Sequence, residues 1–460
     1  MTNPPYTMLH SLPTPMTGYI EGYYGRLLTP QARKQLLLRV AALGMHAYLY
    51  APKEDPQHRS HWRTPYGSAW LADWQDLAQL AQDKKLVLIA GISPGLDFDF
   101  NAAPNTKASA KAKAKDNDND FALLVGKMKT LTKGGVQACL MFDDIDPLNA
   151  GMTHAGDGGA GGNGKGDDRG DRDGGDGGEA EGRQHAMLAN RLGEELDSPL
   201  FLVPRIYADE LAEDSPQYLA AFATTLAKQH YVFYCGSHIV AHHLDLPQTL
   251  IAHAGIATNR LVVWDNLYAH DYCPRRLFLG KWRPVGDARG VMLNPTGMEA
   301  TDSLLLAIMA GRLALGDNAS NQAITQAWQE ALRAAGVPQA FFTIAHAFDL
   351  PPATPANASD TSGDIKHKGE YNYADMLAAV EELVWRWKSP LAREWYPYLM
   401  GLRGDILMAT GKADALRQAK IMPPILHATM QFKGQFRGQF SGQSRGKSRM
   451  QSRGQKPSKA

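Results

Sequence analysis

The sequence predicts an α/β protein built on a (β/α)₈ TIM barrel, followed by a small helical domain. Over the first 310 residues of the 460-residue chain, eight short apolar segments alternate with amphipathic segments of helical periodicity. Polar side chains gather directly after most of the apolar segments, where the carboxyl ends of parallel strands would meet. A doubly wound sheet remains an alternative, because eight strands do not by themselves prove closure.

The predicted strands have the length and apolar character of strands that a parallel sheet buries on both faces. In chain order they are Tyr19–Tyr23, Ala47–Tyr50, Leu86–Gly91, Ala138–Phe142, Phe201–Arg205, Tyr231–Cys235, Leu261–Trp264 and Gly290–Leu293. The segments between them place apolar residues at helical spacing, which predicts helices. These include Pro30–Leu43, Ala69–Gln82, Phe121–Leu131 and Pro216–Lys228.

Composition divides the chain into parts. Residues 103–120 alternate Ala with Lys and then Asn with Asp, and residues 151–182 are rich in Gly and Asp, so both are predicted to be long disordered surface loops. Beyond the barrel, helical periodicity recurs at Ile324–Ala335, Tyr373–Lys388 and Leu391–Met408, with a linker at Pro351–Gly369. We therefore predict an N-terminal extension over 1–16, a barrel over 17–310, a helical domain over 311–425 and a disordered tail over 426–460.

Charge and cysteine content narrow the class of protein. Three distant cysteines argue against a disulfide framework and fit a reducing compartment. No run of 18 apolar residues and no signal-like apolar region appear, so no membrane partner and a cytoplasmic location are expected. Eight Lys and Arg and no acid lie between Phe432 and Ala460, whereas the formal net charge is +1, so the rest of the chain is acidic. Such a tail can bind polyanions weakly, but a solvated tail without a nucleic-acid partner is favoured.

The most informative feature is a pair of acids, Asp143 and Asp144, that ends the apolar run Ala138–Phe142. A buried strand that ends in two carboxylates brings them to the mouth of a barrel, where acid/base work is done. The simpler interpretation is that the pair caps a turn or helix. Seven or eight predicted strands end in such polar or aromatic groups, which favours a pocket for a polyhydroxylated ligand with aromatic walls.

Five segments in unbroken order carry a resemblance to a known family. They are Gly18-Tyr-Ile-Glu-Gly-Tyr-Tyr-Gly-Arg26, Tyr48-Leu-Tyr-Ala-Pro-Lys-Glu-Asp55, Gly91-Ile-Ser-Pro-Gly-Leu-Asp97, Phe142-Asp-Asp-Ile-Asp146, and Val263-Trp-Asp-Asn266 through Asp271-Tyr272 to Arg276-Leu-Phe-Leu-Gly280. Over about residues 17–310 the chain resembles glycoside hydrolase family 84, the protein O-GlcNAcases and bacterial β-N-acetylglucosaminidases, some of them called hyaluronidases.

The resemblance implies cofactor-free, retaining, substrate-assisted hydrolysis of terminal β-linked N-acetylglucosamine (GlcNAc) on a glycoconjugate or glycoprotein. In that mechanism the 2-acetamido oxygen of the substrate attacks the anomeric carbon and forms an oxazoline. Asp143 would then orient the acetamido N–H, and Asp144 would protonate the leaving oxygen and later activate water. Neighbouring strand residues point to opposite faces, so both acids can serve one pocket only where the strand stops or bulges.

The resemblance also assigns the sugar-binding residues. Gly22 and Lys53 would contact hydroxyl groups, although a tight turn and an exposed loop charge are the simpler interpretations of these two. Asp271, which could instead cap a helix, and Asn294 would bind the outer ring hydroxyls. Three residues would contact the acetamido group. Tyr207 would hydrogen-bond its oxygen, and Asn266 would line the same pocket. Trp264 would form a wall against the acetyl group, although a tryptophan at a strand end is otherwise often part of the core. Asp146 and Asp265 are expected to be structural.

The chain departs from the family pattern in three places. Pro204-Arg205-Ile206 stands where relatives usually have Pro-Thr-Glu, and Tyr23 stands where phenylalanine is common. The glycine-rich insertion begins a few residues after Asp144, where it could restrict large substrates.

Two functions of other classes stay open. A pocket without turnover would make a GlcNAc-binding module, which an aryl β-N-acetylglucosaminide would test by release of its phenol. Asp143, Asp144 and Asp146 could instead hold a divalent cation for hydrolysis, although the histidines at 238, 242 and 243 do not support a metal site. No metal is assigned.

Overall fold

Eight parallel strands close into a barrel in the computed structural model, which describes residues 13–98, 100, 114–146, 176–213, 215–283, 288–349 and 371–412. The strands are β1 (Met16–Glu21), β2 (Ala47–Tyr50), β3 (Val87–Ile92), β4 (Gln137–Met141), β5 (Phe201–Val203), β6 (Tyr231–Tyr234), β7 (Leu261–Asp265) and β8 (Gly290–Leu293). Each pairs in parallel with the next, and β8 returns to β1, where Met292 lies beside Gly18. The barrel prediction is therefore confirmed, and the doubly wound alternative is wrong.

Alternation along each strand builds two apolar layers. On β4, Leu140 belongs to the cluster shared with the surrounding helices, whereas Cys139 and Met141 belong to the cluster that fills the barrel. This period of two is what a strand requires when both of its faces are buried. The barrel interior is therefore packed with side chains, and a ligand must bind at a mouth of the barrel rather than inside it.

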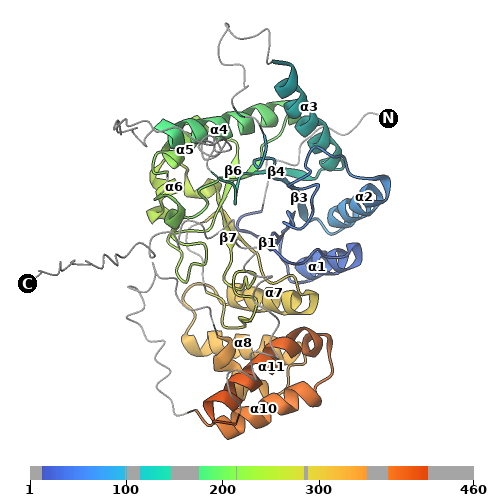
Figure 1. Ribbon diagram of the computed structural model, residues 1–460, viewed down its shortest axis with the longest axis vertical. Helices are drawn as coiled ribbons and strands as arrows, with labels where there is room; N and C mark the ends of the chain where they lie inside the picture. Colours follow the sequence, from blue (N-terminus) through green and yellow to red (C-terminus); the bar gives the residue numbers. More distant parts are fainter. Residues whose placement is uncertain are drawn as a thin grey trace, which may run out of the picture. The chain divides into compact units, whose positions relative to one another are not determined.

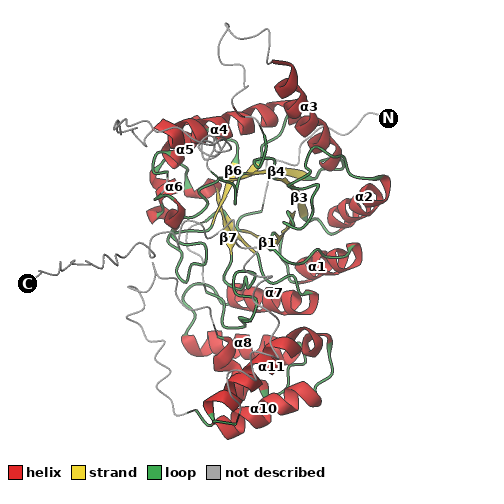
Figure 2. Cartoon of the chain, in the orientation of Figure 1, coloured by secondary structure: helices red, strands yellow, loops and turns green. Residues whose placement is uncertain are grey.

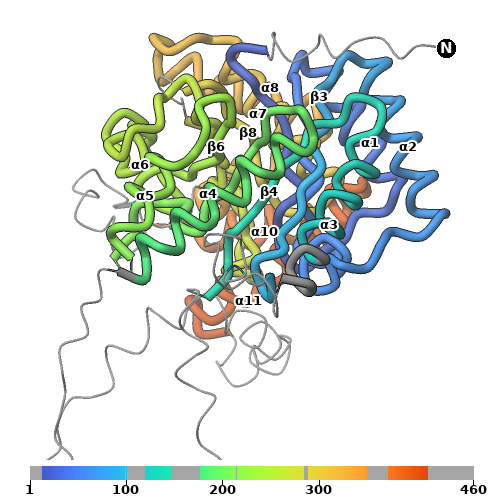
Figure 3. The backbone as a smooth tube through the Cα atoms, turned by 90° about the horizontal axis from the view of Figure 1, so that it is seen from above, coloured from blue at the N-terminus to red at the C-terminus, as the bar shows by residue number. Residues whose placement is uncertain are grey.

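Helices surround the strands (Figures 1 and 2), and the view from above shows α1 to α4 outside β3 and β4 (Figure 3). They are α1 (Pro30–Ala42), α2 (Ser68–Asp83), α3 (Ala114–Leu131), α4 (Asp176–Leu196), α5 (Tyr218–Thr225), α6 (Leu250–His253) and α7 (Glu299–Ala314). The first of them begins as the sequence predicts, because the Thr29 side chain accepts a hydrogen bond from the Ala32 N–H and Pro30 opens the helix.

Two predicted loops are in part helical. The first insertion was predicted to extend to residue 120, but α3 begins at Ala114. The second was predicted to extend to residue 182, but α4 begins at Asp176. Gly182 packs so closely on α5 that a Cβ atom would lie 2.3 Å from the Tyr218 carbonyl oxygen. Glycine there serves helix packing rather than flexibility. The remaining parts of both insertions lie outside the described residues.

Strand ends also differ from the prediction. The first strand ends at Glu21 rather than Tyr23, and β5 ends at Val203 rather than Arg205, because Pro204 cannot donate a hydrogen bond to the ladder. Residues 22–24 and 204–207 are thereby free to leave the sheet. This shortening matters for function, since both segments carry side chains of the site described below.

Helices continue beyond the barrel as α8 (Asn321–Ala334), α9 (Phe341–Ile344), α10 (Tyr373–Trp385) and α11 (Pro390–Ala409). In Figure 1 the helices α8, α10 and α11 lie beyond α7. Glu394 of α11 accepts hydrogen bonds from the backbone N–H groups of Ala300 and Thr301, at 3.0 and 2.8 Å, and so caps α7. The helical domain is thus anchored to the barrel at the start of its last helix. The predicted linker and tail lie outside the described residues, and the domain boundaries stay predictions.

Arg205, one of the residues at which the chain departs from the family pattern, forms a buried ion pair with Glu181. Its Nε lies 2.7 Å from Glu181 Oε1, and its Nη2 donates to Ser215 Oγ at 2.7 Å. The pair joins α4 to the segment that follows β5, with side chains only 8% and 2% exposed.

We expect Arg205→Met to lower the free energy of unfolding by about 3–5 kcal/mol, because it removes the guanidinium that lies 2.7 Å from the buried Glu181 carboxylate. Urea unfolding followed by circular dichroism measures this loss. Arg183→Met is the control, since its pair with Glu179 lies exposed on the same helix and is worth below about 1 kcal/mol. Equal losses for the two variants would contradict the predicted cost of burial.

Candidate active site

The paired acids lie just beyond the end of β4, where the chain leaves the sheet. This strand ends at Met141, and Asp144 has a backbone φ of +55°, in the left-handed region that aspartate tolerates better than most residues. The turn cancels the alternation that would separate neighbouring strand residues. The strand therefore stops before the two acids, which is the condition that the sequence argument set, and Asp143 and Asp144 both contact Lys53.

Asp144 is held by two tyrosine hydroxyls. Tyr207 donates to its Oδ1 and Tyr24 to its Oδ2, each at 2.8 Å. Burial by itself raises the pKa of Asp144, but the Lys53 ammonium, 3.7 Å from Oδ2, acts in the opposite direction. The Arg59 guanidinium and the two hydroxyls add to that effect, and the net result is a lowered pKa. Without substrate, Asp144 is therefore held as a carboxylate.

Asp143 differs from Asp144 in how its two carboxylate oxygens are hydrogen-bonded. Its Oδ2 accepts a short hydrogen bond from the Lys53 ammonium, and both side chains are almost fully buried. Its Oδ1 is buried and lacks a hydrogen-bond partner among the described residues. An unsatisfied carboxylate oxygen costs free energy unless a ligand supplies a donor. The arrangement is suited to a ligand N–H or O–H group.

A second group of predicted residues forms a wall of the same site. The Gly22 N–H donates to Asn294 Oδ1 at 3.1 Å, and Asn294 Nδ2 donates to Asn266 Oδ1 at 2.8 Å. The same oxygen accepts the Trp264 indole N–H at 3.0 Å. Asn266 therefore orients Trp264 and Asn294 and is itself held by the Ile239 carbonyl, at 3.0 Å. Trp264 is only 6% exposed, and it belongs to this polar network as well as to the core.

Asp271 lies beside Tyr24, which follows Gly22 in the chain by two residues. Its Oδ2 accepts the backbone N–H of Tyr24 at 3.0 Å, and Tyr24 in turn reaches Asp144. Burial is the main cause that raises the pKa of Asp271, and the charge of Asp144 contributes in the same direction. The structure thus brings all nine predicted site residues into one neighbourhood, drawn from the ends of six strands.

Two residues of the site were missed by the sequence argument. Tyr24 stands in a quoted motif without an assigned role, and Arg59 was not singled out at all. Arg59 Nη1 donates to the Tyr24 hydroxyl at 2.7 Å, and Nη2 donates to the backbone carbonyl of Asp144. Only the Tyr-Tyr pair after the first strand was a usable signal, because Arg59 lies in a loop six residues beyond Lys53.

The expected structural acids behave differently from each other. Asp265 accepts the Trp282 indole N–H at 2.7 Å and pairs with Arg283 at 3.0 Å, so it is structural as predicted. Asp146 is exposed. Within the described parts of the chain, no group of three or more His, Cys, Asp or Glu side chains is placed to hold a metal ion. In the same described parts, no helix is long and apolar enough to span a membrane.

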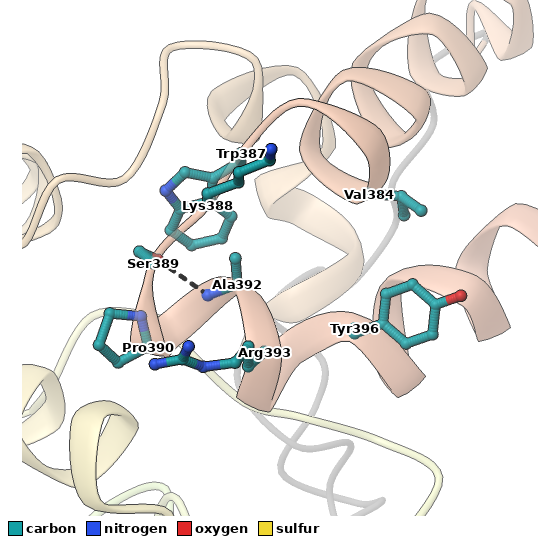
Figure 4. A pocket seen from close by; sticks show the side chains of 8 residues that line it. All are labelled: Val384, Trp387, Lys388, Ser389, Pro390, Ala392, Arg393 and Tyr396. Atoms are coloured by element: carbon teal, nitrogen blue, oxygen red, sulfur yellow. Dashed lines mark hydrogen bonds between the residues drawn. The ribbon is translucent and has the colours of Figure 1, made fainter.

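A recess of about 740 Å³ lies elsewhere, between α10 and α11 (Figure 4). Its lining includes Trp387, Lys388, Arg393 and Tyr396, and none of the predicted site residues. It is therefore a separate feature of the helical region.

Gly22 must lack a side chain for the wall to form. A Cβ atom at this position would lie 2.4 Å from the Trp264 ring, so Gly22→Ala has to displace the indole. We expect the variant to lose about 1–3 kcal/mol of unfolding free energy in urea and to shift the tryptophan emission. Gly126→Ala is the control: no atom lies within 4 Å of its Cβ, it is exposed on α3, and it should gain about 0.5–1 kcal/mol. Unchanged stability and emission for Gly22→Ala would contradict the packing argument.

Carboxylates, amides, an ammonium group and an indole at the carboxyl ends of barrel strands are the groups that a glycoside hydrolase site requires. A family model described as beta-N-acetylglucosaminidase matches residues 17–346. The chain therefore belongs to this family, glycoside hydrolase family 84, and the resemblance seen in the sequence is confirmed.

Individual relatives agree with this assignment. The chain is 25% identical over 291 residues to the protein O-GlcNAcase of Rattus norvegicus and 26% identical over 292 residues to that of Mus musculus. Each alignment spans 61% of this chain but only 28% of the relative. The solved structure of CpGH84B (TM-score 0.59, 20% identity) covers 85% of this chain and 66% of that one. A mutant Thermobaculum terrenum O-GlcNAc hydrolase (TM-score 0.60, 18% identity) covers 85% and 80%. At these identities the two structures show a shared fold.

Proposed function

We propose that the protein is a retaining β-N-acetylglucosaminidase that releases terminal β-linked GlcNAc by substrate-assisted catalysis. The observation that carries this proposal is the unequal pair of neighbouring carboxylates. Asp143 presents a buried oxygen without a donor, whereas Asp144 is held by two hydroxyl groups and two cations. Two acids with separate environments can take separate roles in one reaction.

Asp143 meets the acetamido group in this proposal. Its free Oδ1 accepts the amide N–H, which fixes the acetamido carbonyl oxygen for attack on the anomeric carbon. As that oxygen bonds to carbon, positive charge develops on the amide nitrogen, and the carboxylate stabilises it. Lys53, bound to the other oxygen, keeps Asp143 in place and offers its remaining protons to sugar hydroxyls.

Asp144 must gain a proton before it can act on the leaving oxygen. The groups that lower its pKa include Lys53 and Tyr207, which are also expected to bind the sugar and the acetamido oxygen. Contacts to substrate would draw both groups away from Asp144 and raise its pKa, so that binding itself prepares the acid. After the aglycone leaves, the same carboxylate takes a proton from the water that opens the oxazoline.

The substrate we propose is a polypeptide or glycan that carries terminal GlcNAc. The curated relatives named protein O-GlcNAcase favour a modified protein. Trp264 would wall the acetyl group, while Asp271 and Asn294 would bind the outer hydroxyls of the ring. No cofactor takes part, and a cytoplasmic location, which fits a protein substrate of this kind, belongs to the same proposal.

An aryl β-N-acetylglucosaminide series tests both the activity and its mechanism. Successive fluorination of the acetyl group weakens the acetamido oxygen as a nucleophile, so kcat/KM should fall steeply along the series. NMR should show the β-anomer as the first product. A flat series would point to an enzyme nucleophile, and sensitivity to a chelator would point to the metal hydrolase. Binding without turnover would point to the GlcNAc-binding module.

A further inference from the structure

Arg59 holds Asp144 from two directions. One guanidinium nitrogen, Nη2, donates to the backbone carbonyl of Asp144, and the other, Nη1, donates to the Tyr24 hydroxyl at 2.7 Å. That hydroxyl donates to Asp144 Oδ2 at 2.8 Å. The backbone and the side chain of one residue are thus tied to a single guanidinium group, which also lies 6.0 Å from the centre of the Tyr24 ring.

The backbone contact matters because of the conformation of Asp144. A φ of +55° is uncommon for a residue other than glycine, and it persists only where the surroundings hold it. Arg59 fixes the peptide group that follows this torsion. Without that contact, the residue is free to relax toward an ordinary conformation, which would turn its carboxylate away from Lys53 and Tyr207.

The side-chain contact fixes the direction of one carboxylate oxygen. Tyr24 has one hydroxyl proton, and the donor from Arg59 occupies a lone pair of that oxygen. The proton is therefore directed at Oδ2. Because Tyr207 also donates to Oδ1, both oxygens of Asp144 are hydrogen-bonded and the carboxylate is fixed in one orientation.

We propose that Arg59 is a positioning residue for Asp144, which sets the orientation of the proton-donating carboxyl group through its carbonyl and through Tyr24. This inference rests on the proposed function and adds to it a residue that touches no substrate. The planar fork of arginine supplies two donors with fixed geometry, whereas lysine supplies a compact charge that cannot span both acceptors.

The test compares Arg59→Met and Arg59→Lys with the wild type on two aryl glycosides. One has a poor leaving group that needs a proton, and the other is a dinitrophenyl glycoside that does not. For Arg59→Met we expect kcat/KM, which reports the steps up to departure of the leaving group, to fall on the order of 10²-fold on the first substrate and by less than about 10-fold on the second. Arg59→Lys should recover only part of the loss.

A pH profile gives a second readout. Among the described residues, the charged and titratable groups that interact with Asp144 include Tyr24, Arg59, Lys53, Tyr207, Asp271 and Cys235, beside the neighbouring Asp143. Lys53 and Arg59 are the cations that lower the pKa of Asp144 most. Removal of Arg59 raises the pKa of Asp144, so the high-pH limb of the profile, where the proton donor is lost, should move to higher pH in Arg59→Met. A variant that is only less stable would keep the limb where it is.

Arg63→Met is the matched control. Arg63 lies in the same loop but pairs with Asp97 and Asp120 at a partly exposed position, so its kinetics should match the wild type. If Arg59→Met does not fold, Tyr24→Phe should reproduce the dependence on the leaving group. Equal losses on both substrates, an unmoved pH limb, or full recovery by Arg59→Lys would overturn the role of Arg59 alone. An inactive wild type would overturn the proposed function as well.

Discussion

Replacement of Asp144 by asparagine is expected to lower kcat/KM by about 10³-fold or more on substrates with poor leaving groups, because general acid catalysis contributes 10²- to 10⁴-fold. Asparagine keeps the shape and can accept the hydrogen bond from one tyrosine, but it has no acidic proton to give. A dinitrophenyl glycoside needs no proton at its leaving oxygen, so we expect a much smaller loss there. Steady-state kinetics on both substrates measure the difference.

The fold of the Asp144→Asn variant is checked by its melting temperature, because Lys53 keeps Asp143 as a partner and the site should stay assembled. Losses of equal size on the two substrates would show that Asp144 acts in some way other than proton donation. Asp146→Asn serves as the control, since Asp146 is exposed and lies outside the network.

Replacement of Asp143 by asparagine should reduce kcat by about 10²- to 10³-fold on both substrates alike, the size of effect seen when one preorganised stabilising group is removed. The reason is that Asp143 is assigned to the formation of the oxazoline, in which the acetamido oxygen bonds to the anomeric carbon while the bond to the leaving group breaks, whatever that leaving group is. Asparagine also has only one acceptor oxygen, whereas the aspartate carboxylate has two, one for Lys53 and one for the amide N–H.

The two aspartate variants thus form a pair with opposite patterns. Dependence on the leaving group is expected for Asp144→Asn and not for Asp143→Asn. The fluorinated acetyl series should remain steep for Asp144→Asn. If Asp143→Asn instead loses activity only on poor leaving groups, the two roles are exchanged and the assignment is wrong.

Much of the architecture was predictable because it depends on local pattern. Strand length, apolar runs and Pro or Thr at helix starts reflect short-range preferences, and these placed β2 and β8 at their observed bounds and α1 within one residue. The starts of α3 and α4 were not predictable in the same way. At Gly182 composition indicated a loop, whereas close packing on Tyr218 is what selects glycine there.

The sequence alone determined the chemical inventory of this protein: the order of the strands, the paired acids after the fourth, and the lysine, tyrosine and amides after the others. Those features follow from the chain order and residue type, which no folding step changes. Only the tertiary structure decided how the two acids differ. The left-handed turn at Asp144 and its contact with Arg59, 85 residues away, arise where the segments that follow β2 and β4 meet, and environment rather than residue type sets which carboxylate is held and which is left open to a ligand.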